Sequence, residues 1–127
     1  MDSFLLAEMW VLHCIGYCLY LVGDVDEEKR KHNEIVHKMK ENLKEKSNDF
    51  LLYGLSLYNI GISQYRSFEN RQAYRSLVDA LQAQSTATDF ESKKEKRDLV
   101  NQTMKAIEVF AVDYYPASPN SPTLYQF

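Results

Sequence analysis

The sequence contains few of the residues that interrupt helices. All three prolines, Pro116, Pro119 and Pro122, lie in the last twelve residues, and the 127-residue chain has only four glycines. No segment shows the period-two alternation of a half-buried strand. Apolar residues recur instead three and four positions apart, which is typical of helices. We therefore predict an all-α fold: a compact antiparallel bundle of about five helices over 1–115, followed by an extended, proline-containing C-terminal tail over 116–127.

The sequence also lacks a strong excess of either charge. Fifteen basic and 18 acidic residues give a formal net charge of −3. Such a chain has no electrostatic attraction for nucleic acid or an acidic membrane, so we expect no nucleic-acid partner. The residue pattern indicates no cofactor and no metal site either.

Only two cysteines are present, Cys14 and Cys18. They lie four residues apart in an apolar segment, so a helix would stack them on one face. A buried free cysteine behaves as a small hydrophobe, and we interpret both as reduced core residues. Reduced cysteines are typical of a reducing compartment, which predicts a cytoplasmic protein.

One long hydrophobic run is present, from Phe4 to Val22. Its length allows a membrane anchor over 4–22, which we keep as an alternative. Glu8 and His13 interrupt the run, however, and a carboxylate in mid-bilayer is costly. We therefore predict a helix that ends at Gly23 and lies at the centre of the bundle or partly in an oligomer interface.

The remaining helices are predicted from their capping signals. Asp24 and Glu27 resemble a capping box, and Thr88 and Glu91 have the spacing of another. Together with the polar breaks between them, these signals predict helices over 24–46, 49–66, 69–84 and 88–115.

The predicted helix over 49–66 carries an unusual stripe, which alternates small and large residues: Gly54, Tyr58, Gly61 and Tyr65. Glycine costs helix stability, so two glycines on one face predict the close approach of another helix. We also take the four residues as candidate binding residues.

Residues 57–81 resemble one helical hairpin of the tetratricopeptide repeat family, through Ile60-Gly61, Ala73 and Leu77. The resemblance implies an antiparallel helix pair packed closely at small residues. No second copy occurs 34 residues away in either direction, so no repeat array is predicted.

Two histidine arrangements are candidates for catalysis. Glu28 and His32 lie four apart within an apolar stripe, where a carboxylate and an imidazole can act as an acid–base pair. His37 followed by Lys40 resembles the motif of histidine phosphotransfer domains, which implies a phosphorylated His37 assisted by Lys40. The alternative function is therefore a phosphotransfer protein or another small helical enzyme that uses His37 or His32.

The predicted function is non-enzymatic. Nine tyrosines and six phenylalanines exceed the needs of a minimal core, and tyrosine is favoured at interfaces. We expect a protein-binding or regulatory module, such as an adaptor, an inhibitor or immunity-type protein, or an assembly subunit. Its partner would be another protein or a second copy. Leu124, Tyr125 and Phe127 are candidate anchors by which the tail docks on its own bundle or on a neighbouring subunit.

Overall fold

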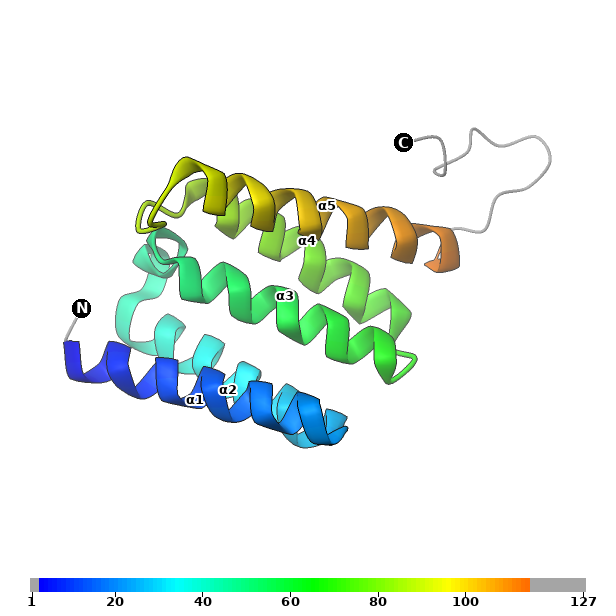
Figure 1. Ribbon diagram of the computed structural model, residues 1–127, viewed down its shortest axis with the longest axis horizontal. Helices are drawn as coiled ribbons and strands as arrows, with labels where there is room; N and C mark the ends of the chain where they lie inside the picture. The colour runs from blue at the N-terminus through cyan, green and yellow to red at the C-terminus, as the bar shows by residue number, and fades with distance from the viewer. Residues whose placement is uncertain (1–2, 115–127) are drawn as a thin grey trace.

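The computed structural model describes the backbone of residues 3–114 and the side chains of residues 3–110. The elements in this range are α1 (Ser3–Val22), α2 (Val25–Leu43), the short 3-10 helix η1 (Lys44–Asp49), α3 (Leu51–Arg66), α4 (Asn70–Thr86) and α5 (Lys93–Tyr114) (Figure 1). No strand occurs among the described residues. The predicted all-α fold with five principal helices is confirmed.

The helices form two layers. In Figure 1, α1, α3 and α5 lie in front, and α2 and α4 lie behind them. Each helix packs chiefly against the helices that precede and follow it in the chain. The bundle is therefore a row of antiparallel neighbours, with α1 at one end and α5 at the other.

The turn that joins α1 to α2 and the turn that joins α3 to α4 are built alike. Gly23 ends α1 with a φ of 81°, and Phe68 follows α3 with a φ of 62°. The Asp24 carboxylate then accepts a hydrogen bond from the Glu27 N–H at the start of α2, 3.2 Å away. The predicted glycine stop and Asp24 cap are therefore confirmed.

The start of α5 differs from the prediction. The helix begins at Lys93, and the hydroxyl of Ser92 accepts the Glu95 N–H at 3.0 Å. The predicted capping box at Thr88 is wrong, because the Thr88 N–H donates to the Asp49 carbonyl instead. The carboxylate of Asp89 accepts the N–H of Leu51 at 2.6 Å, so it caps α3 rather than α5.

Helix packing repeats along the chain at a spacing of 45 residues. A Cβ placed on Gly61 would lie 2.8 Å from Cγ of Leu77, and a Cβ on Gly16 would lie 2.8 Å from Cε1 of His32. Gly61 and Leu77 follow Gly16 and His32 by 45 residues, as Phe68 follows Gly23. The α1–α2 and α3–α4 hairpins are therefore equivalent in these contacts, at a spacing of 45 residues rather than the 34 of the tetratricopeptide repeat.

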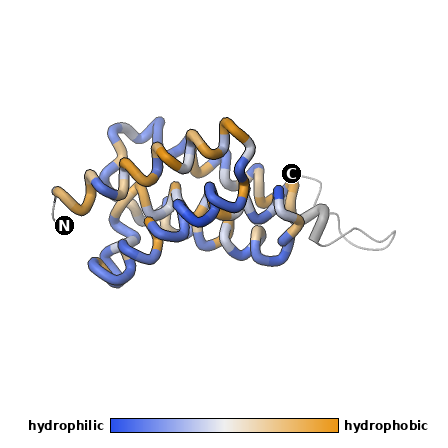
Figure 2. The backbone as a smooth tube through the Cα atoms, turned by 90° about the horizontal axis from the view of Figure 1, so that it is seen from below, coloured by the Kyte–Doolittle hydropathy of each residue, from blue (hydrophilic) through white to orange (hydrophobic). Residues whose placement is uncertain are grey.

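The predicted central position of the first helix is wrong. α1 packs chiefly against α2 at one end of the row, and only Met9 and Gly16 are buried. Figure 2, viewed from this side, shows α1 as a mostly hydrophobic tube beside the mostly hydrophilic α2. By length and composition, α1 is a candidate membrane span, of which 11% is buried. Cys14 and Cys18 are free but exposed, so they are not core residues.

Candidate functional site

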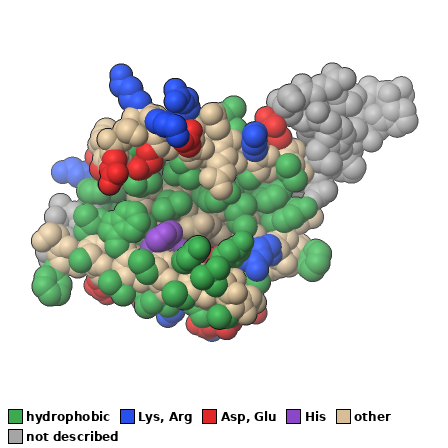
Figure 3. All heavy atoms as spheres, viewed as in Figure 1, with side chains coloured by type: hydrophobic (Ala, Val, Ile, Leu, Met, Phe, Trp, Pro, Cys, Tyr) green, Lys and Arg blue, Asp and Glu red, His purple; other side chains and the backbone are tan. Residues whose placement is uncertain are grey.

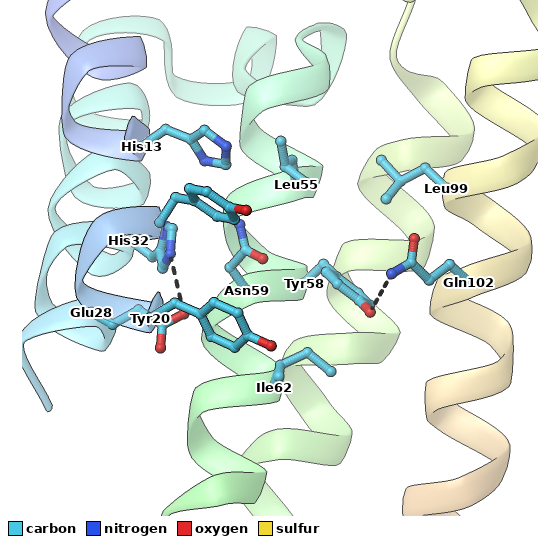
Figure 4. A pocket seen from close by; sticks show the side chains of 11 residues that line it. His13, Tyr20, Glu28, His32, Leu55, Tyr58, Asn59, Ile62, Leu99 and Gln102 are labelled. Atoms are coloured by element: carbon cyan, nitrogen blue, oxygen red, sulfur yellow. Dashed lines mark hydrogen bonds and ion pairs between the residues drawn. The ribbon is translucent and has the colours of Figure 1, made fainter. Parts of the chain in front are cut away.

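A cleft of about 340 Å³ opens on the front face of the bundle, where α1, α3 and α5 lie side by side. In Figure 3 hydrophobic side chains gather on this face around a histidine. Its walls are formed by α1, α2, α3 and α5, and Figure 4 shows the side chains that line it. The lining residues are His13, Tyr17, Tyr20, Glu28, His32, Leu55, Tyr58, Asn59, Ile62, Leu99 and Gln102.

His32 is the most buried of the residues that line the cleft. Its side chain is packed against Gly16, where α1 and α2 cross, and the residue is only 1% exposed. Burial lowers the pKa of His32 from 6.5 to about 4, and the neighbouring His13 acts in the same direction. The imidazole is therefore neutral at pH 7, which is how a buried histidine avoids the cost of desolvating a charge.

Glu28 lies beside His32, as predicted from their spacing on one helix face. Its Oε2 is 3.8 Å from Nε2 of His32, and its Oε1 accepts a hydrogen bond from Arg66 at 3.2 Å. Burial raises the pKa of Glu28, whereas the Arg66 guanidinium and the Ser63 hydroxyl lower it. The same guanidinium lies 4.9 Å from the ring centroid of Tyr20. Arg66 thus ties the buried carboxylate to the aromatic rim of the cleft.

His13 brings a second imidazole to the cleft. Its ring centroid is 5.8 Å from that of His32, and burial lowers its pKa. Nδ1 of each histidine is buried and has no hydrogen-bond partner among the described residues. A buried polar atom without a partner is uncommon and often marks a functional position.

The wall of the cleft opposite the two histidines carries both polar and apolar side chains. Nε2 of Gln102 donates a hydrogen bond to the Tyr58 hydroxyl at 3.0 Å, which joins α5 to α3. Burial raises the pKa of Tyr58, so its hydroxyl stays protonated. Asn59 and Leu55 lie on α3 between this wall and the histidines (Figure 4).

The structure separates the four candidate residues of α3. Tyr58 lines the cleft, whereas the ring of Tyr65 stacks on Phe110, with centroids 3.9 Å apart. Gly54 and Gly61 are buried beneath α4. The close helix approach predicted from the two glycines is confirmed, and it occurs within the chain.

His37 and Lys40 lie away from the cleft on the exposed side of α2. The side chain of His37 is 80% exposed, and its Nε2 lies 3.5 Å from the Glu41 carboxylate. The structure therefore brings Glu28 and His32 together with Tyr58 but leaves His37 apart. Leu124, Tyr125, Phe127 and the predicted tail over 116–127 lie outside the described residues.

Sequence reasoning missed several cleft residues, above all His13, Tyr17, Asn59 and Gln102. One signal for His13 and Tyr17 is present in the sequence: they precede Tyr58 and Ile62 by 45 residues, and all four line the cleft. The hairpin repeat thus places equivalent positions side by side on the front face.

Comparisons with protein-family models, with curated proteins and with solved structures find no match to this chain.

Proposed function

We propose that the chain is a non-enzymatic protein-binding module that receives its partner in the front cleft. The observation that carries the proposal is the lining of the cleft. Three tyrosines, two side-chain amides and the apolar residues Leu55, Ile62 and Leu99 surround one opening. This is the composition of protein recognition surfaces, which combine buried aromatic area with a few directional polar groups.

Tyrosine serves such a surface well. Its ring buries a large apolar area while only two side-chain torsions are fixed, and its hydroxyl can bond to a main chain. The Tyr58 hydroxyl is already held by Gln102, so this group is ordered before a partner arrives. Ordering in advance lowers the entropy lost on binding.

The size of the cleft indicates what part of a partner enters it. About 340 Å³ lies at the lower end of the range for ligand sites, roughly 300–1,000 Å³. This space accommodates one aromatic or large aliphatic side chain of a partner segment. The amides of Asn59 and Gln102 lie at its walls, where they can bond to the partner's main chain.

A peptide selection tests the proposal. Random peptides displayed on phage are selected on the purified full chain, and their affinities are measured by calorimetry. Leu55→Arg places a long cation in the cleft and should weaken binding at least about tenfold. Val78→Arg is the matched control, because Val78 lies on α4 outside the cleft and is 41% exposed. Equal losses in both variants would contradict the proposal.

A small helical enzyme that uses His32 is the second candidate. The observation in its favour is a neutral imidazole beside a buried carboxylate in a cleft, an arrangement often found in active sites. The His32→Leu variant tests this candidate. It should keep the packing against Gly16, because Leu77 packs against Gly61 at the equivalent position of the second hairpin. Hydrolytic or phosphotransfer turnover that is present in the wild type and lost in this variant would replace the binding proposal with the enzymatic one.

A further inference from the structure

α1 carries an apolar surface on the side that faces away from the rest of the bundle. We call it the α1 outer face, formed by Val11, Cys14, Ile15, Cys18, Leu19 and Val22. Val11 is 57% exposed, Ile15 41% and Val22 77%. None of the six is an acidic or basic residue, and together they line a shallow groove. A continuous apolar surface of this kind marks an interaction site.

The hairpin repeat shows what kind of contact this face is built for. Val11 and Cys18 precede Ser56 and Ser63 of α3 by 45 residues, and Ile15 precedes Ile60. All three α3 residues are buried. The helix face that carries them also carries Leu52, which shares a core cluster with Ile35 and Met39 of α2. The α1 outer face is therefore the equivalent of the face that α3 packs against a neighbouring helix.

We propose that a second copy of the chain covers this face with its own α1, in an antiparallel pair about a two-fold axis. The face has no charge to be matched, so it is complementary to itself, as an interface between identical surfaces must be. Antiparallel pairing also places the N-terminal end of each helix dipole beside the C-terminal end of the other. The middle of the face, between Ile15 and Cys18, then lies at the axis, which brings Cys14 of one copy close to Cys18 and Leu19 of the other.

A head-to-tail pairing with the other end of the row fits poorly. The first turns of α5 expose Lys94, Arg97 and Asp98, and an apolar face would remove water from these charges, of which only Lys94 and Asp98 pair with each other, at 2.9 Å. The pairing of α1 with α1 avoids this cost. It also closes the assembly at two copies, whereas a head-to-tail contact continues into a filament.

A membrane surface also fits poorly. Helices that lie on membranes carry lysine or arginine along their polar edge, and α1 has neither. The helix is held to the protein by Met9, which is 0% exposed, and by an ion pair of Glu8 with Lys38 at 2.5 Å. Insertion into lipid would break these contacts, and the net charge of −3 opposes an acidic membrane.

Sedimentation of the full chain tests the proposal. The wild type should sediment as a dimer, and Ile15→Glu should raise the dimer dissociation constant at least about 30-fold, because each interface then buries two carboxylates. Val78→Glu is the matched control, since Val78 is also 41% exposed, and it should stay dimeric. Circular dichroism checks that both variants keep their helices. A monomeric wild type, or an Ile15→Glu variant that dimerises as tightly as the wild type, would overturn the proposal.

Cross-linking tests the geometry of the pair. In the antiparallel pair a short bismaleimide should join Cys14 of one chain to Cys18 of the other. The wild type should therefore give a covalent dimer, Cys18→Ser should give much less of it, and Ile15→Glu should abolish the product. No product from a dimer that does form would overturn the antiparallel arrangement. A wild type that floats with uncharged lipid vesicles and remains monomeric without them would assign the face to lipid instead.

Discussion

Phe68 shows at the scale of one residue how the two hairpins differ. It has a φ of 62°, in the left-handed region that costs a non-glycine residue roughly 1–2 kcal/mol. Gly23 occupies the equivalent turn of the first hairpin with a φ of 81°. The side chain of Phe68 is 90% exposed, so it gains little from packing in return.

Replacing Phe68 with glycine should therefore stabilise the protein by about 1 kcal/mol, despite the greater entropy of glycine in the unfolded chain. Urea unfolding measures the change. The reverse substitution, Gly23→Ala, meets no neighbouring atom within 4 Å and should destabilise by a similar amount through backbone strain alone. A lower urea midpoint for Phe68→Gly would show that the ring contributes more than its exposure indicates.

His32 predicts a dependence of stability on acidity. The unfolded histidine titrates near pH 6.5, whereas its pKa in the folded chain is about 4. Between these values the unfolded chain binds a proton at His32 that the folded chain does not, so stability falls as the pH is lowered. Integrated over this window, the loss is roughly 3 kcal/mol, with no further loss from this group below about pH 4.

His32→Leu should remove the loss of stability that His32 causes at low pH, while the carboxylates keep their own dependence of stability on pH. The measurement is the free energy of unfolding of both proteins at a series of pH values from 4 to 7. Subtracting the two curves gives the contribution of His32 together with its effect on the neighbouring His13 and Glu28. Parallel curves throughout this range would contradict a neutral, buried His32.

At the scale of elements, the start of α3 depends on a residue from another part of the chain. Phe50 precedes α3 and offers no capping side chain, and the Asp89 carboxylate accepts the Leu51 N–H instead. Asp89→Ala should cost about 1 kcal/mol, the usual value of a lost N-terminal cap. Thermal or urea unfolding measures it. Glu91→Ala is the matched control, because Glu91 is exposed and caps no helix here; an equal loss in both variants would argue against the cap.

The sequence predicts elements well where the signals are local. The last residue of α1 was predicted correctly, and the bounds of α2 and α4 were predicted to within three residues. These predictions succeed because Gly23, Asp24 and the polar breaks act on their immediate neighbours. The start of α5 was missed because Thr88–Glu91 and Ser92–Glu95 have the same capping spacing. They are distinguished by contacts with the distant start of α3, in which Thr88 bonds to Asp49 and Asp89 bonds to Leu51.

The candidate site could be predicted only in part. The spacing of Glu28 and His32 placed both on a buried helix face, because helix periodicity is local. The partners of this pair on α1, α3 and α5 depend on how the hairpins stack. That stacking is encoded in a 45-residue repeat whose identical residues are few, among them Gly16 with Gly61 and Tyr20 with Tyr65. A search at one fixed spacing of 34 residues could not find it.

At the scale of the whole molecule, two hairpins and a fifth helix form a row, with contacts mainly between neighbours. Such a row leaves two kinds of surface: a front face along its length and a free face at each end. The front face holds the cleft, and the α1 outer face is one of the ends. The proposed partner and the proposed second copy therefore occupy different surfaces, so both can bind at once.

The most direct test of the central claim is to map where a selected peptide binds. Titration of the ¹⁵N-labelled full chain with that peptide should shift the backbone amide signals of cleft residues such as Tyr17, Asn59 and Gln102. The signals of His37 and Val78, on other surfaces, should stay in place. Shifts confined to the α1 outer face or to the exposed side of α2, with the cleft signals unchanged, would contradict the account.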